Sequence, residues 1–175
     1  MSLTDHKIQN IIDYNGGHFK PMEFGENRHN LNAYAVRRFI EFRSWHGMPT
    51  YISSAWRGDD GAHKLGAFDA FLYNDYEITQ PEPGQIWRIL TTWPWWGAGI
   101  YFDTHAFDNP AIMIHVDVMD YKEAKQMNKQ RPLRWIRKDG AYYYQNTKTG
   151  GFWSQENQEM TTLEEEITKY KANSD

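Results

Sequence analysis

One apolar run near the middle of the chain, residues 111–118 (AIMIHVDV), most constrains the fold. In an extended strand, successive side chains point to opposite sides. One side of this strand is aliphatic and mostly β-branched, and consists of Ile112, Ile114, Val116 and Val118. The other side carries Met113, His115 and Asp117, which must face either solvent or a polar site. The run therefore predicts a sheet with one core face and one face bearing polar groups.

The elements around this strand predict the fold class. Amphipathic or capped patterns predict helices at 3–14, 32–46 and 85–92, and short apolar patterns predict strands at 50–54, 68–73, 99–102 and 111–119. Most predicted helices precede most predicted strands along the chain, and the elements do not follow a regular strand–helix–strand alternation. The sequence predicts an α+β fold in which a small, mostly antiparallel sheet has flanking helices.

The composition changes after Met119. Residues 120–129 predict a charged helical connector, and 133–136 and 141–145 predict two strands joined by a turn at Asp139-Gly140. Thr161 and Glu164 have the spacing of a capping box, which predicts a closing helix. We therefore divide the chain into a main domain, residues 1–129, and a C-terminal hairpin and helix appendage, residues 130–175.

Three side chains have the chemistry of a catalytic zinc site. The stretch 52–69 (ISSAWRGDDGAHKLGAFD) contributes His63 and Asp69, and the strand at 111–118 contributes His115. The chain has no Cys, so a metal must be held by His, Asp or Glu. Two imidazoles and one carboxylate leave the fourth zinc position for water. His63 taken alone is more simply interpreted as a solvated loop residue. The second histidine, His115, lies in an apolar strand, and its presence favours the interpretation of both as zinc ligands.

Asp117 shares a strand side with His115. It can orient that imidazole, or act as the base that takes a proton from water. The alternative is an ordinary exposed carboxylate on a strand.

Charge and hydropathy exclude two classes of partner. The net charge of −4, from 19 basic and 23 acidic residues, is unlike that of a nucleic-acid-binding protein. The sequence contains no apolar run near eighteen residues and no pattern of an export signal at its start, so a membrane partner is not expected. These features predict synthesis as a soluble cytoplasmic protein.

The motifs resemble, in order, those of the zinc D-alanyl-D-alanine carboxypeptidase and L-alanyl-D-glutamate endopeptidase family, which shares its fold with the Hedgehog signalling domain. The resemblance covers residues 20–120. The matching residues are Ile52-Ser53-Ser54-Ala55-Trp56-Arg57, then His63, Gly66 and Asp69, then Gly99-Ile100-Tyr101, and last Ile114-His115-Val116-Asp117-Val118.

The resemblance implies roles for these residues. His63, Asp69 and His115 would be the zinc ligands, and Arg57 would bind a substrate carboxylate through its planar fork of donors. The simpler interpretation of Arg57 is a surface ion pair with Asp59 or Asp60. The implied reaction is hydrolysis of an amide in the peptidoglycan stem peptide by a phage or prophage endolysin.

Three departures from the family pattern bear on activity. Asp69 follows His63 by six positions instead of seven, and a one-residue slip can turn a strand side chain to the opposite face. Gly61 replaces the usual Ser. Met113 and Ile112 stand where many members have an acidic residue or His, so the base would be Asp117 or come from the loop Asp103 to Asp108.

These departures leave two functions open. The first is a zinc peptidase that acts on the bacterial cell wall after release by a separate protein, or from within a virion. The second is a catalytically inactive member of the same fold, acting as a cell-wall-binding or virion structural module, with phage virion proteins as partners.

The appendage has its own resemblance. Trp135, Asp139-Gly140, Tyr142-Tyr143-Tyr144 and Trp153 look like a WW domain, although the Pro that usually follows the second Trp is missing. The interpretation we favour is a small hairpin whose aromatic side chains pack on the main domain.

Overall fold

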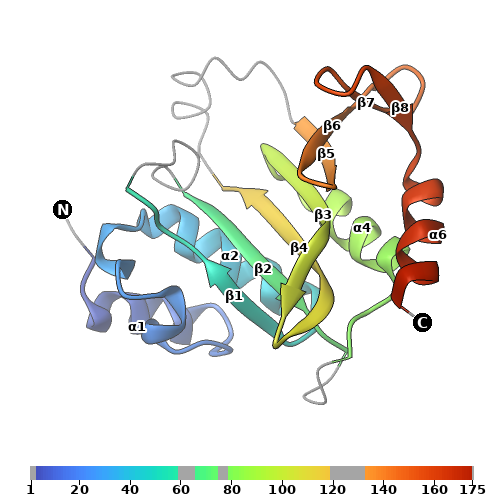
Figure 1. The fold of residues 1–175 in the computed structure, drawn as a ribbon. Helices are drawn as coiled ribbons and strands as arrows, with labels where there is room; N and C mark the ends of the chain where they lie inside the picture. Colours follow the sequence, from blue (N-terminus) through green and yellow to red (C-terminus); the bar gives the residue numbers. More distant parts are fainter. Residues whose placement is uncertain (1–2, 59–65, 75–78, 119–132, 175) are drawn as a thin grey trace.

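The structure is a computed structural model that describes residues 3–58, 66–74, 79–118 and 133–174. The described residues form an α+β fold with four α-helices and one eight-stranded sheet (Figure 1). The helices are α1 (Asp5–Tyr14), α2 (Ala33–His46), α4 (Pro83–Thr92) and α6 (Leu163–Ser174), and two short 3-10 turns, Pro21–Phe24 and Arg28–Asn30, link α1 to α2. The strands are β1 (Thr50–Ser54), β2 (Ala67–Leu72), β3 (Gly97–Ala106), β4 (Asn109–Asp117), β5 (Leu133–Lys138), β6 (Ala141–Gln145), β7 (Phe152–Ser154) and β8 (Glu159–Thr161).

Local capping signals set the start of α1 and both ends of α2. The Thr4 side chain accepts a hydrogen bond from the backbone of Lys7 at the start of α1, and Asn32 caps α2 in the same way. Gly47 ends α2 with a left-handed φ of 77°, a conformation that glycine adopts at low cost. The predicted connector at 120–129 lies outside the described residues.

The strand order is β1-β2-β4-β3-β5-β6-β7-β8, and each neighbouring pair is antiparallel except β3 and β5. The prediction of a mostly antiparallel sheet is therefore confirmed. The C-terminal hairpin does not stand apart from this sheet, because Gly99 of β3 pairs with Trp135 of β5. Residues from both predicted parts of the chain, 1–129 and 130–175, thus share one sheet.

One face of the sheet forms the core, as the alternation in β4 predicts. Ala70, Ile114, Ile100 and Ile136 lie opposite one another on four adjacent strands and are fully buried. Figure 1 shows α2 and α4 behind the strands.

Aromatic contacts fix these helices to the core face. Phe39 of α2 stacks on Phe68 of β2 at 4.4 Å between ring centroids. Trp87 of α4 meets Phe152 of β7 edge to face at 5.5 Å. Such pairs add a specific geometry to the burial of large apolar surfaces.

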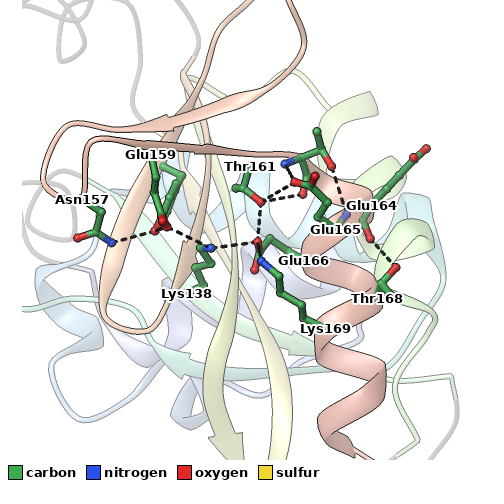
Figure 2. A network of polar contacts seen from close by, with 11 residues as sticks. Lys138, Asn157, Glu159, Thr161, Glu164, Glu165, Glu166, Thr168 and Lys169 are labelled. Carbon is green, nitrogen blue, oxygen red and sulfur yellow. Dashed lines mark hydrogen bonds and ion pairs between the residues drawn. The ribbon is translucent and has the colours of Figure 1, made fainter.

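A buried carboxylate anchors α6 to the hairpin (Figure 2). Glu166 accepts hydrogen bonds from Lys138 at 3.0 Å and Lys169 at 2.9 Å, and from the hydroxyl of Thr161. Burial opposes ionisation of Glu166, but these hydrogen bonds outweigh it and hold its pKa below the ordinary value. The helix itself is capped by Thr162 and Glu165, one residue later than predicted, because Thr161 is the buried last residue of β8.

No described helix combines the length and the apolar character needed to cross a lipid bilayer.

The anchor predicts a stability difference between two glutamates of α6. Glu166→Ala leaves the ammonium of Lys138 without its buried partner and is expected to lower the free energy of unfolding by roughly 3 kcal/mol. Glu164→Ala, an exposed matched control, is expected to change it by less than about 0.5 kcal/mol. Urea unfolding at pH 7 measures both. Equal effects of the two substitutions would contradict the anchoring role.

Candidate functional site

The candidate site is a histidine between two carboxylates on the face opposite the core. Asp69 of β2 and His115 of β4 are direct cross-strand partners, and Nδ1 of His115 lies 2.7 Å from Oδ1 of Asp69. The Nε2 atom of His115 lies 3.2 Å from Oδ1 of Asp117. All three side chains are buried, so these contacts are made in an environment where electrostatic interactions are strong.

The carboxylates change the protonation of the histidine. Burial alone would lower the pKa of His115, but the hydrogen bonds to Asp117 and Asp69 and the charges of both carboxylates raise it to about 9. In the metal-free protein at neutral pH the imidazole is therefore a cation that donates from both nitrogens. A metal ion at His115 would have to replace one of these protons.

The shortened spacing between His63 and Asp69 does not turn Asp69 away from His115. The backbone N–H of Val118 donates to the carbonyl of Gly66 at 2.8 Å, so the pairing of β2 with β4 continues to the residue before β2. Gly66 has a φ of +122°, which favours glycine, and a Cβ atom there would meet Ala35 at 2.7 Å. Asp69 thus reaches the face that carries His115.

Arg57 joins this group from the segment after β1. Its Nη2 atom donates to Oδ2 of Asp69 at 3.3 Å, and its side chain is about half exposed. Asp69 therefore uses one oxygen toward His115 and the other toward Arg57. The guanidinium lies where it can meet both the carboxylate and a solute at the surface.

Two aromatic rings form walls beside the histidine. Tyr101 of β3 lies nearly parallel to the His115 ring at 6.2 Å, and Trp135 of β5 lies 5.3 Å from it. Burial raises the pKa of Tyr101 above its ordinary value, and the hydroxyl of Tyr142 contributes, so Tyr101 stays neutral and can act as a hydrogen-bond donor.

Glycines of β3 make room for this arrangement. A Cβ atom on Gly99 would lie 2.2 Å from Nε1 of Trp135, and one on Gly97 would lie 2.1 Å from Oδ2 of Asp117. The bare backbone of β3 lets the indole and the carboxylate lie across it.

The structure thus brings together four of the six residues predicted for the site: Arg57, Asp69, His115 and Asp117. His63 lies outside the described residues. Asp108 does not join the group, because it sits in the turn between β3 and β4, seven residues from His115, a distance on the order of 20 Å along the strand. Within the described part of the chain, the structure contains no cluster of three or more His, Asp, Glu or Cys arranged to hold a metal ion.

Sequence reasoning missed Trp135 and Tyr101 as walls of the site. For Tyr101 a signal existed, since Gly99 and Tyr101 alternate with the apolar Ala98, Ile100 and Phe102 and so belong to the polar face. For Trp135 the position depends on the parallel pairing of β5 with β3, which has no local signature. The expectation that the hairpin aromatics pack on the main domain holds for Trp135, which contacts His115, and for Tyr142, which contacts Tyr101, whereas Tyr144 and Trp153 are about half exposed.

Comparisons with family models, with curated proteins and with solved structures found no match for this chain.

The contacts of His115 predict an unusual titration. In protein treated with a chelator, the imidazole is expected to titrate at about 9, compared with about 6.5 in an unfolded chain. Because the folded pKa is the higher one, the charged imidazole stabilises the fold below pH 6.5, and this stabilisation is lost as the pH rises through 9. Nuclear magnetic resonance of the imidazole nitrogens measures the midpoint. Asp117→Asn should lower it and Asn10→Ala should not, and a wild-type midpoint at or below 6.5 would refute the arrangement.

The close approach at Gly99 predicts a packing defect. Gly99→Ala forces the buried indole of Trp135 to move and is expected to cost about 1–3 kcal/mol of stability. Gly84→Ala is the control, because its Cβ atom would meet only Ile167, at an ordinary 3.8 Å, and its effect should stay within about 1 kcal/mol. Thermal unfolding followed by circular dichroism compares the two. A Gly99→Ala protein as stable as the wild type would show that Trp135 is free to shift.

Proposed function

We propose that this protein is a zinc-dependent peptidase that hydrolyses an amide bond in the peptidoglycan stem peptide, of the phage or prophage lysis type. The observation that carries the proposal is the 2.7 Å contact between His115 and Asp69, two residues predicted as zinc ligands from segments 46 positions apart.

The donor atoms suit zinc. An imidazole nitrogen and a carboxylate oxygen are common zinc ligands, and both lie in a buried place where hydrogen bonds orient them. His115 and Asp69 would hold the ion, and His63 is the third ligand expected from the sequence. When bound, zinc supplies a Lewis acid that polarises a carbonyl group and makes hydroxide available near neutral pH.

The residues of the chain would supply the rest of the reaction. Asp117 lies beside His115 and is the carboxylate expected to take a proton from water and pass it to the leaving amine. Arg57, at the surface end of the group, is expected to bind a carboxylate of the substrate with two parallel hydrogen bonds. Tyr101 and Trp135 would restrict water around the reacting groups, which strengthens electrostatic interactions there.

The alternative function is the catalytically inactive module that binds cell walls or belongs to a virion. One observation favours it: in the described structure both nitrogens of His115 are satisfied by carboxylates, which is a stable arrangement without a metal. The two functions predict different amounts of bound zinc and different effects of replacing His115 on cell-wall clearing. One set of variants therefore distinguishes them.

The peptidase function predicts coupled losses of metal and activity. The wild type should hold about one equivalent of zinc and clear a suspension of bacterial cell walls. His115→Ala and Asp69→Ala should lose the zinc and lower the clearing rate at least about 100-fold, because each removes a ligand. His105→Ala, an exposed histidine on β3, should change neither. Elemental analysis by mass spectrometry and turbidity measure the two quantities.

Two results would decide for the alternative. The first is a wild-type protein purified with zinc in the buffer that carries no metal and leaves walls intact. The second is unchanged affinity for cell walls in His115→Ala together with no clearing by any variant.

A further inference from the structure

A single cross-strand row connects the candidate site to the C-terminal strands. Asp69, His115 and Gly99 are successive partners on β2, β4 and β3. The row continues through Trp135 on β5, Tyr144 on β6 and Trp153 on β7. Directly paired residues share one face of a sheet. The face that carries His115 therefore extends, without a change of side, onto the hairpin strands.

The far end of this row is an exposed aromatic pair. Tyr144 and Trp153 are direct partners, and 50% and 40% of their surfaces are exposed, whereas Trp135 at 7% is buried beside His115. Large aromatic groups are usually covered in a folded protein, so a half-exposed pair at this position is a surface available for contact.

The groove beside this pair is lined mainly by neutral hydrogen-bonding groups. It has a volume of about 560 Å³, and besides the two rings it is lined by Gln145, Asn146, Thr147, Lys148 and Gln155. Amide and hydroxyl groups can both donate and accept hydrogen bonds. Its one charged residue, Lys148, is basic although the protein is acidic overall.

We propose that this groove binds the glycan strand of peptidoglycan, a polymer of N-acetylated amino sugars whose lactyl groups carry the stem peptides. A sugar ring offers an apolar C–H face to Tyr144 and Trp153, and hydroxyl and amide groups at its rim match the amides of the groove. A proline-rich peptide fits less well, because its prolines have no backbone N–H to donate to the amide oxygens. This inference names part of the substrate and rests on the proposed function.

The row also sets a minimum size for the substrate. Four strand steps of about 4.8 Å separate His115 from Trp153, so the two sites lie roughly 19 Å apart along the sheet. A fully extended peptide advances about 3.4 Å per residue, so only a stem peptide of several residues attached to its sugar spans both. Trp135 lies on this path between its two ends, and Tyr142 stacks beside Tyr144.

The experiment uses the full chain and a sugar probe without peptide. Tetra-N-acetylglucosamine is titrated into ¹⁵N-labelled protein while the indole N–H signals of the eight tryptophans are followed. The Trp153 signal should shift and the signal of Trp45, an exposed tryptophan on α2, should not. Tyr144→Ala should weaken binding about tenfold, since it removes one stacking partner. Tyr14→Ala, which removes the most exposed of the described tyrosines, is the matched control.

The outcomes separate this inference from the proposed function. The inference is supported if, with both variants still folded by circular dichroism, His115→Ala binds the sugar as the wild type does and Tyr144→Ala binds it about tenfold more weakly. It stands even if no variant clears cell walls, in which case the peptidase function alone fails. It is overturned if Tyr144→Ala binds the tetrasaccharide normally, if the wild type shows no shift, or if a proline-rich decapeptide shifts Trp153 and the sugar does not.

Discussion

The register between β2 and β4 is the constraint on which the candidate site depends. It places Asp69 directly opposite His115, and a slip of one residue would move every side chain of β2 to the other face. The core face holds this register, because Phe68 and Ala70 are fully buried and Phe68 stacks on Phe39 of α2. Apolar packing on one side of the sheet thus fixes the position of polar groups on the other.

The buried charges of the site also depend on this register. A cation between two carboxylates is stable only while all three groups stay together, since each would be costly to bury alone. Removing one partner leaves an unbalanced charge in a place that water hardly reaches. The arrangement is therefore sensitive to small shifts of the strands, which is the property expected of a site that has to hold donor atoms in a fixed position.

Much of the fold was predictable from local patterns in the sequence. The two-sided strand at 111–118 and the turn at Asp139-Gly140 both depend on neighbours along the chain, and the structure confirms them. For the site, the sequence indicated the residue types and four of the residues that meet. It did not decide whether Asp69 faces His115, because that depends on how the chain enters β2 at Gly66.

The features that were not predicted depend on contacts between distant segments. The parallel pairing of β5 with β3 joins residues more than 30 positions apart, and parallel pairs lack the tight turn that reveals a hairpin. The wall formed by Trp135 follows from that pairing, and the anchor at Glu166 joins α6 to Lys138 of β5, 28 positions earlier. The sequence also predicted one loop from Asp103 to Asp108 that could supply the base. In the structure β3 extends to Ala106, and most of the length of β4 separates the turn at Asp108 from His115.

The parallel pair also has a consequence for the order of folding. The β3–β4 hairpin closes through a two-residue turn at Phe107 and Asp108 and can form early, because its contacts are local. Strand β5 can join only when a much longer loop has closed, which costs more entropy. Within this hairpin His115 already has Asp117 and Tyr101 beside it, whereas its contacts with Asp69, 46 positions away, and with Trp135 form only when longer loops close. A nascent chain would therefore pass through a stage in which the histidine has one carboxylate partner and is still hydrated.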